Sequence, residues 1–306
     1  MTKNAQIAII GTGFSGLGMA IKLKEAGFHD FVILEQSDDI GGTWHENHYP
    51  GCACDVQSAL YSFSFEQNPD WSRMFATQPE IKAYLKRCAE KYGLMGHIQL
   101  NTHVAGAHWD EKAGAWAIET CDSPKLWAYI QDKGLRPGDK LDRHDKDLPW
   151  FSKLNADILV SGMGGLSTPS YPDIKGIETF TGTSFHSQDW DHGYDLRGKR
   201  VAVIGTGASA IQFVPEVAKE AAQLDLYQRT PPWIMPKPDR EIRPLEKIMF
   251  RKFPQTLNAF RQSIYWMLEG RVLGFVGNPR ILKVGELQAR RHIRSQIRDK
   301  ELRKKV

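Results

Sequence analysis

The sequence is poor in cysteine, has no long apolar run and carries little excess charge of either sign. Only four cysteines occur in 306 residues. Cys52 and Cys54 are separated by one residue, which is neither the CxxC spacing of a redox disulfide nor that of a paired zinc knuckle. Cys88 and Cys121 have no partner at motif spacing. The thiols are therefore expected to be incidental and reduced, as in a cytoplasmic protein.

Other absences exclude further classes of protein. No apolar segment has the length of a membrane span, and Ile7–Ile10 is too short for a signal-peptide core. A net charge of +4 is too small to favour nucleic-acid binding. We expect one charged helix over 286–305, with the basic stretch 290–305 as its solvated face. The stretch His45–Tyr49 begins like HExxH but ends in tyrosine where that motif requires histidine, so no metal site is predicted. No protein partner is evident.

Two glycine motifs dominate what is present, the first being Gly11-Thr12-Gly13-Phe14-Ser15-Gly16. It follows the apolar run 6–10, and after a helix-like stretch a second apolar run ends at Glu35. This order of strand, glycine turn, helix, strand and acid is typical of a Rossmann unit. The glycines permit the turn and let a pyrophosphate approach the helix N-terminus. An acid at position 35 binds the hydroxyls of a ribose that has no 2′-phosphate.

The second motif is Gly205-Thr206-Gly207-Ala208-Ser209-Ala210, between predicted strands at 200–204 and 224–227. We expect a helix over 211–222, and alanine is allowed as the third motif residue. Counting 24 residues from each first glycine (11 + 24 = 35; 205 + 24 = 229) reaches Glu35 and Arg229. An arginine there pairs with a 2′-phosphate, the alternative being a solvated arginine at a strand end. The two units predict two dinucleotides, most simply FAD and NADPH.

Two further stretches lack helical or strand periodicity. Residues 41–55 combine glycine, tryptophan, tyrosine and proline, which predicts a packed loop beside the first cofactor. Asp55 at its end is either an acid beside a redox cofactor or a turn-capping residue. Residues 180–191 are by themselves typical of a linker with aromatic packing, in which His186 is a structural histidine.

Both stretches resemble fingerprints of the type I Baeyer–Villiger monooxygenases. Residues 180–191 match FxGxxxHxxxW(P/D), and residues 41–55 match [A/G]GxWxxxx[F/Y]P[G/M]xxxD, at every fixed position. The two glycine motifs flank them in the family's order. Relatives that oxidise nitrogen or sulfur usually carry tyrosine and a basic residue where this sequence has Trp190-Asp191, which favours the Baeyer–Villiger branch. The resemblance extends to about Trp233.

The resemblance implies an α/β fold with two Rossmann-like domains, for FAD and NADPH, and a helical subdomain at the C-terminal end. The expected divisions are 1–170 for the FAD domain with an insertion at 122–155, 171–198 for the linker, 199–232 for the start of the NADPH domain, and 233–306 for an incomplete helical subdomain. Only two strands are predicted after Lys199, and the family's later Lys-Arg pair is not found. The chain is therefore expected to be truncated.

The resemblance also implies a reaction. NADPH reduces the flavin, O2 forms a C4a-peroxyflavin, and one oxygen atom enters next to a ketone carbonyl to give an ester or lactone. Asp55 and His186 are the implied catalytic residues, Asp55 by positioning the cofactor and His186 by coupling domain rotation to the cycle. The implied cofactor-binding residues are Gly11, Gly13, Phe14, Ser15, Gly16, Glu35, Gly42, Thr43, Trp44, Cys54, Asp55, Tyr61, Val104, Gly162, Gly205, Thr206, Gly207, Ala208, Ser209, Arg229 and Thr230.

Two alternatives remain open at this point. One is a truncated, non-catalytic fragment that binds nucleotides, suggested by the missing strands and the missing Lys-Arg pair. The other is a flavin monooxygenase that oxidises nitrogen or sulfur, suggested by the shared glycine units. The sequence does not identify the ketone.

Overall fold

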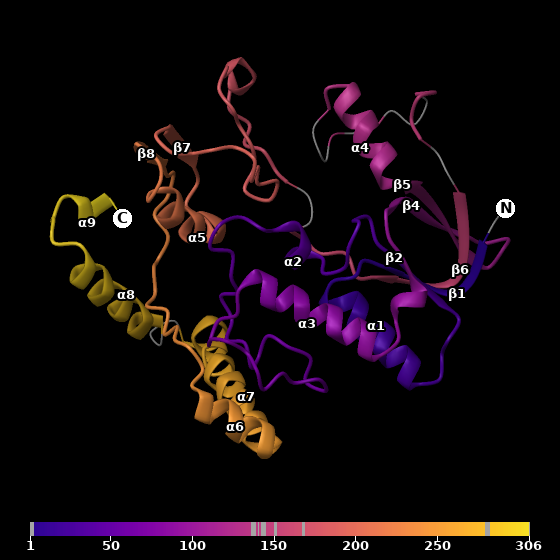
Figure 1. The fold of residues 1–306 in the computed structure, drawn as a ribbon, viewed down its shortest axis with the longest axis horizontal. Helices are drawn as coiled ribbons and strands as arrows, with labels where there is room; N and C mark the ends of the chain where they lie inside the picture. The colour runs from indigo at the N-terminus through magenta and orange to yellow at the C-terminus, as the bar shows by residue number, and fades with distance from the viewer. Residues whose placement is uncertain are drawn as a thin grey trace. The chain divides into compact units, whose positions relative to one another are not determined.

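The computed structural model describes residues 3–135, 139, 141, 145–149, 152–166, 169–278 and 282–305. The chain divides into two compact units, one comprising 1–48 and 81–190 and the other comprising 49–80 and 191–306. Strands and helices occur in both units, as Figure 1 shows. The predicted α/β fold class is confirmed.

The first unit is built on a six-stranded sheet of order β3-β2-β1-β6-β5-β4 (Figure 1). Its strands are β1 (Lys3–Ile10), β2 (Phe31–Leu34), β3 (Ile98–Gln99), β4 (Thr102–Asp110), β5 (Ala115–Asp122) and β6 (Ser152–Ser161). β1 pairs in parallel with β2 and β6, and β2 in parallel with β3. β5 pairs antiparallel with β4 and β6. Every residue of β2 is buried, as expected for a parallel strand covered on both faces.

Helix α1 (Phe14–Glu25) lies against β1, and helix α3 (Gln78–Lys91) lies beside α1 (Figure 1). Leu17 and Ile21 of α1 are fully buried. The ring of Phe14 stacks on Tyr84 of α3 with centroids 6.1 Å apart. Past the end of α1, Gly27 has a φ of 89°, and this left-handed conformation turns the chain toward β2. The remaining short helices of this unit are α2 (Thr43–Glu46), η1 (Met95–His97) and η2 (Ile177–Thr179).

The segment predicted as an insertion, 122–155, overlaps the ends of β5 and β6. It holds helix α4 (Ser123–Asp132), which begins where the Asp122 carboxylate accepts a hydrogen bond from the Lys125 amide at 3.1 Å. A small core forms beneath α4 from Cys121, Leu126, Tyr129, Ile130 and Leu148. The described part of the segment is thus a packed helical element. Residues 136–138, 140, 142–144, 150 and 151 lie outside the described residues.

The second unit contains the parallel strands β7 (Arg200–Ile204) and β8 (Gln223–Tyr227), joined through α5 (Ala208–Val217). The predicted bounds of this helix, 211–222, were wrong at both ends. It begins directly at the glycine turn, and Pro215 lies in its last turn. Because proline removes a helical hydrogen bond, it fits an ending helix better than a continuing one. In the part of the chain that is described, this sheet has two strands.

The rest of the second unit is helical where it is regular. Its elements are α6 (Pro244–Lys252), α7 (Pro254–Glu269), η3 (Leu273–Gly277), α8 (Leu282–Gln296) and α9 (Leu302–Lys305). The predicted single helix over 286–305 was wrong, because the Asp299 carboxylate accepts hydrogen bonds from the amides of Glu301 and Leu302 and starts a separate turn. Within the described ranges, no helix has the length and apolarity needed to cross a membrane.

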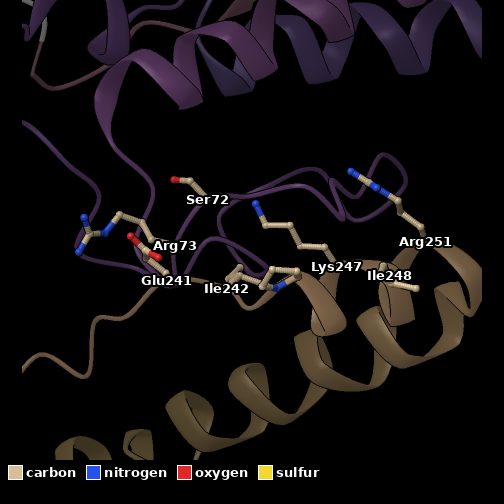
Figure 2. A pocket seen from close by; sticks show the side chains of 8 residues that line it. Ser72, Arg73, Glu241, Ile242, Lys247, Ile248 and Arg251 are labelled. Carbon is tan, nitrogen blue, oxygen red and sulfur yellow. The ribbon is translucent and has the colours of Figure 1, made fainter.

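The segment 49–80 is held within the second unit by ion pairs and carbonyl contacts. Arg73 pairs with Asp239 at 2.8 Å, and Arg261 donates to the carbonyls of Ala59 and Leu60 at 2.9 and 2.7 Å. A pocket of about 580 Å³ lies where this segment meets α6, and Figure 2 shows the side chains that line it. Its lining residues are Ser72, Arg73, Glu241, Ile242, Pro244, Lys247, Ile248 and Arg251.

Candidate functional site

The first glycine turn connects the end of β1 to the start of α1. Gly11 has a φ of 93°, which side chains disfavour. A Cβ on Gly16 would lie 1.9 Å from the carbonyl oxygen of Gly11, so only glycine lets α1 approach the turn this closely. A Cβ on Gly13 would meet nothing nearer than the Cα of Gly42 at 3.9 Å. The turn is therefore tightly packed where Gly16 meets Gly11, and it has space for a ligand beside Gly13 at the N-terminus of α1.

Gly162, which follows β6, closes the turn from the other side. Its amide donates to the carbonyl of Ile10 at 2.9 Å. A Cβ there would lie 2.7 Å from that oxygen and 3.0 Å from the amide nitrogen of Gly16. Gly42, with a φ of 53°, would place a Cβ 2.9 Å from the Cα of Gly13. The glycines predicted to bind the first cofactor therefore meet around the start of α1.

The helices that follow the two glycine turns begin without caps. Neither Gly13 before α1 nor Gly207 before α5 provides a side-chain cap, and neither helix has an acid in its first turn. By contrast, Asp122 caps α4, and Glu246 accepts a hydrogen bond from the Arg243 amide at the start of α6. Uncapped amides and an uncompensated positive dipole end suit a bound phosphate. Both turns fit the pyrophosphate of a dinucleotide.

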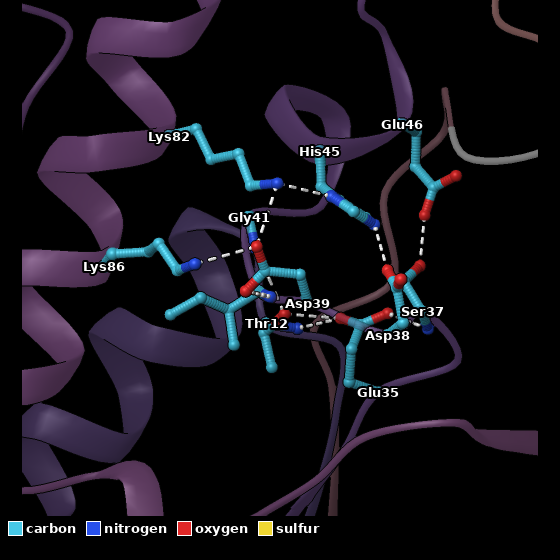
Figure 3. Close-up of polar contacts among 11 residues, drawn as sticks. Thr12, Glu35, Ser37, Asp38, Asp39, Gly41, His45, Glu46, Lys82 and Lys86 are labelled. Carbon is cyan, nitrogen blue, oxygen red and sulfur yellow. Dashed lines mark hydrogen bonds and ion pairs between the residues drawn. The ribbon is translucent and has the colours of Figure 1, made fainter.

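Glu35 follows β2 directly and is 5% exposed. Its Oε2 accepts hydrogen bonds from the Thr12 amide at 2.8 Å and the Thr12 hydroxyl at 2.5 Å. Its Oε1 accepts from the Ser37 amide at 3.0 Å, and Figure 3 shows these contacts. Because a carboxylate offers about four acceptor positions, capacity remains for one ribose hydroxyl.

Thr12 is a functional residue that the sequence did not single out. It is fully buried, donates to Glu35, and accepts a hydrogen bond from the Gly41 amide at 3.3 Å (Figure 3). Thr12 thereby ties the glycine turn to the strand end and to the following loop. The fingerprint leaves its second position unspecified, and only Thr206, at the equivalent position of the second glycine motif, was among the predicted residues.

A charged network joins the loop that follows Glu35 to α3 (Figure 3). Lys82 and Lys86 each place Nζ 2.9 Å from Oδ2 of Asp39. Lys82 Nζ also lies 2.8 Å from Nδ1 of His45. An ammonium group can only donate, so Nδ1 accepts, and a neutral His45 carries its proton on Nε2. That nitrogen faces Oδ1 of Asp38 at 3.0 Å.

The predicted packed loop over 41–55 contains one helical turn, α2, so the absence of helix there was wrong. The amides of His45 and Glu46 both donate to the carbonyl of Gly42, at 2.8 and 3.0 Å. Trp44 is 7% exposed and Thr43 is half-buried. The motif is divided after His48, since Tyr49 onward belongs to the second unit. The network around Lys82 therefore fixes the part of the motif that carries Thr43 and Trp44.

Replacing Asp39 with asparagine is expected to destabilise the first unit by about 2 kcal/mol at neutral pH, because it removes the negative charge that pairs with Lys82 and Lys86. Burial raises the pKa of Asp39, but the hydrogen bonds from Lys86 and Lys82 outweigh this and hold it well below its usual range. Stabilisation from a carboxyl with a depressed pKa is present above the unfolded value of about 4 and is lost as the pH falls below it. Thermal unfolding of both proteins between pH 3 and 7 measures this.

The difference between the wild type and Asp39→Asn should shrink as the pH falls below about 4. A matched control is Glu25→Asn, which removes an exposed ion pair with Lys22 and should cost less than about 1 kcal/mol. A difference that does not change with pH would contradict the ionic role of Asp39.

The predicted residues at the end of the motif lie in the second unit. Cys54 is buried, and burial raises the pKa of its thiol to about 11. Its carbonyl oxygen accepts a hydrogen bond from Lys237 at 3.0 Å. Asp55 is exposed and Tyr61 is half-buried. In the described residues, no cluster of three or more histidine, cysteine or acidic side chains could hold a metal ion.

His186 and Val104 both lie in the first unit. His186 is half-buried, its Nδ1 accepts from the Gln188 amide at 3.1 Å, and its ring lies 5.5 Å from that of Tyr171. Burial lowers the pKa of His186, which favours the neutral ring. Val104 is half-buried on β4, beside a register shift in its pairing with β5.

The second glycine turn has the same backbone conformation as the first, but fewer residues pack against it. Gly205 has a φ of 108°, and a Cβ on Gly205 or Gly207 would meet nothing within 4 Å. In the described chain, no third strand backs this turn as β6 backs the first. Arg229 and Thr230 follow β8 and are exposed, and within the described ranges Arg229 has no ion pair.

Comparisons with known proteins agree with the sequence resemblance. Residues 9–77 match a family described as an NAD(P)-binding Rossmann-like domain, and residues 156–275 match a flavin-binding monooxygenase-like family. A Baeyer–Villiger monooxygenase of Pseudomonas aeruginosa is 53% identical over 99% of this chain and 52% of its own length. One from Streptomyces coelicolor is 42% identical over 99% of this chain and 53% of its own length.

A solved structure is similar as well. Cyclohexanone monooxygenase from Rhodococcus sp. Phi1, bound to NADP+, superposes with a TM-score of 0.69 at 29% identity, covering 84% of this chain and 44% of that one. The chain spans about half the length of the curated relatives it matches. Over nearly its whole length, the chain is therefore similar to about half of a Baeyer–Villiger monooxygenase.

Proposed function

We propose that this chain supplies the FAD- and NADPH-binding parts of a Baeyer–Villiger monooxygenase. The reaction uses NADPH and O2 to insert one oxygen atom next to the carbonyl of a small-molecule ketone, which gives an ester or lactone. The observation that carries the proposal is the pair of uncapped glycine turns whose strand ends bear opposite charges, Glu35 and Arg229. Similarity to curated Baeyer–Villiger monooxygenases and to a flavin-binding monooxygenase-like family supports the same assignment.

The first unit would bind FAD. The amides at the start of α1, which no side chain caps, would bind the pyrophosphate, and Glu35 retains capacity for a ribose hydroxyl. Thr43 and Trp44, on the turn held by Lys82 and His45, would line the flavin. Bound FAD would supply electron transfer between NADPH and O2, chemistry that no side chain provides.

The second unit would bind NADPH. The start of α5, with Ser209 in its first turn, suits the pyrophosphate. Arg229, exposed and unpaired among the described residues, would bind the 2′-phosphate, with Thr230 beside it. Asp55 would orient the cofactor near the reacting atoms. His186 would act within the inter-domain segment 171–198, coupling movement to the catalytic cycle without transferring a proton.

A cytoplasmic location is part of the proposal. All four cysteines are buried, and among the described residues none forms a disulfide. Free thiols are usual where the cell keeps cysteine reduced.

The proposal is tested by purifying the chain and measuring bound flavin, nucleotide affinity and product. We expect flavin absorbance with FAD equimolar to protein, and NADP+ bound more tightly than NAD+ by calorimetry. Cyclohexanone with NADPH and air should then give its lactone, detected by gas chromatography. Protein that binds neither nucleotide would contradict the proposal. Binding of both without lactone or any other ester would favour the non-catalytic alternative.

A further inference from the structure

The loop Tyr49–Cys54 packs on helix α5, which follows the second glycine motif, and one glutamine of α5 makes the hydrogen bonds between them. Gln212 Oε1 accepts hydrogen bonds from the Tyr49 hydroxyl at 3.0 Å and from the Ala53 amide at 3.1 Å. Gln212 Nε2 donates to the carbonyl of Ala53 at 2.8 Å. One side chain thus satisfies both backbone groups of Ala53, as a neighbouring strand would.

The packing around this contact leaves little freedom. Gly51 has a φ of 77°, and a Cβ there would lie 2.8 Å from the backbone carbonyl oxygen of Gln212. The Tyr49 ring meets Phe213 edge-on, with centroids 6.0 Å apart. Tyr49 and Phe213 are 7% and 8% exposed. The loop therefore docks on α5 by shape as well as by hydrogen bonds.

Tyr49 also reaches the predicted phosphate-binding turn. Its hydroxyl is hydrogen-bonded to Ser209, which belongs to the second glycine motif and lies in the first turn of α5. Burial raises the pKa of Tyr49 to about 12, so it is a neutral phenol at ordinary pH. A phosphate bound at the start of α5 would lie beside the hydroxyl that Tyr49 contacts.

On the other side, the same contact helps to hold the chain that leads to Asp55, together with backbone hydrogen bonds from Cys54 to Ala76 and from Gln78 to Cys52, both 2.9 Å. Ala53 is held by Gln212, and the next residue, Cys54, is held through its carbonyl by Lys237 at 3.0 Å. The Lys237 ammonium is in turn placed over the Phe75 ring, 4.6 Å from its centroid. Asp55 thus follows two consecutive residues whose backbones are fixed by side chains from distant parts of the sequence.

We propose that Gln212 and Tyr49 are positioning residues that transmit nucleotide binding at the start of α5 to the loop that carries Asp55. This rests on the proposed function, since it requires a nucleotide at the second glycine turn. A phosphate that orders Ser209 also orders Tyr49, and Gln212 shares an acceptor between Tyr49 and Ala53. The bound nucleotide thereby stabilises the position of Asp55.

The test is hydrogen exchange of peptides covering residues 50–56 in the whole chain, with and without NADP+. In the wild type, NADP+ should slow exchange there. Gln212→Met keeps the volume and removes all three hydrogen bonds, so exchange without nucleotide should be about tenfold faster. NADP+ should then bind within about threefold of wild type, because Gln212 itself makes no phosphate contact, yet no longer slow exchange in the loop.

Gln223→Met is the matched control, because Gln223 is exposed and, among the described residues, its side-chain amide donates to Asp225 alone. It should behave as the wild type does. Tyr49→Phe removes the link to Ser209 but keeps the Ala53 contacts, so it should lose the effect of NADP+ with little change in the free protein. This variant keeps the test decisive if Gln212→Met fails to fold.

Two results would overturn the proposal while leaving the proposed function intact. One is a wild type that binds NADP+ with no change in loop exchange, and the other is loop protection by NADP+ that persists in both variants. If the wild type binds no NADP+, the proposed nucleotide site at the start of α5 is wrong. The proposed role of Gln212 and Tyr49 is then wrong as well.

Discussion

Replacing Gly16 with alanine is expected to empty the first dinucleotide site. The added Cβ would lie 1.9 Å from the Gly11 carbonyl oxygen, which is backbone and cannot rotate away. Helix α1 would have to move off β1, and its N-terminal amides would leave the phosphate position. Overpacking typically costs about 1–3 kcal/mol, and a clash with backbone belongs at the upper end. FAD content should fall to below about a tenth of the wild-type value, measured by flavin absorbance after denaturation.

The matched control is Gly96→Ala. A Cβ at this exposed position would meet nothing within 4 Å, and Gly96 is not among the glycines with positive φ. Its FAD content and thermal unfolding should equal those of the wild type. Stoichiometric FAD together with an unchanged unfolding temperature in Gly16→Ala would show that the close approach of α1 to Gly11 is not required.

Much of the first site could be predicted because its signals are local in sequence. The apolar runs before Gly11 and before Glu35, and the spacing between these two residues, define β1, β2 and the turn. The motif requires glycine at position 16, and the structure shows why, because a Cβ there would lie 1.9 Å from the Gly11 carbonyl oxygen. What the fingerprint does not specify is Thr12, whose hydroxyl binds Glu35.

The other elements depend on contacts far apart in the sequence. Lys82 and Lys86 fix the loop at Asp39 from α3, more than 40 residues later. Gln212 holds Ala53 from 159 residues away. No periodicity in residues 41–55 could reveal that the motif divides after His48. Local sequence patterns predict the strands and turns, whereas contacts between residues far apart in the sequence form only when the chain folds and leave no local pattern.

The wrong helix predictions have local causes as well. Charged residues recur from 286 to 305 at a spacing compatible with one helix, but Asp299 accepts hydrogen bonds from the amides of Glu301 and Leu302 and interrupts it. A short acidic side chain that accepts hydrogen bonds from nearby amides favours a new helix start over a helix interior. Charge periodicity alone therefore overestimated the length of the helix.

Glu35 and Arg229 occupy equivalent sequence positions but differ in what holds them. Glu35 is buried and already accepts three hydrogen bonds from Thr12 and Ser37. Arg229 is exposed and, within the described residues, has no ion pair. A substitution at Glu35 would thus disturb both folding and binding. Arg229 offers the cleaner test of nucleotide selectivity, because its removal leaves no buried group unsatisfied.

Replacing Arg229 with alanine is expected to weaken NADP+ binding by about 100-fold and to leave NAD+ binding unchanged, because hydrogen bonds to charged groups contribute about 1.5–3 kcal/mol each. The loss is confined to the nucleotide with a 2′-phosphate, since an exposed arginine contributes little to folding. Calorimetric titration with both nucleotides measures the ratio of affinities. Arg197→Ala is the control, as Arg197 is exposed in the same unit and pairs with Asp195 at 2.9 Å. Equal weakening of NADP+ and NAD+ binding by Arg229→Ala would mean that Arg229 does not read the 2′-phosphate, and that the charge at the second strand end does not select the cofactor.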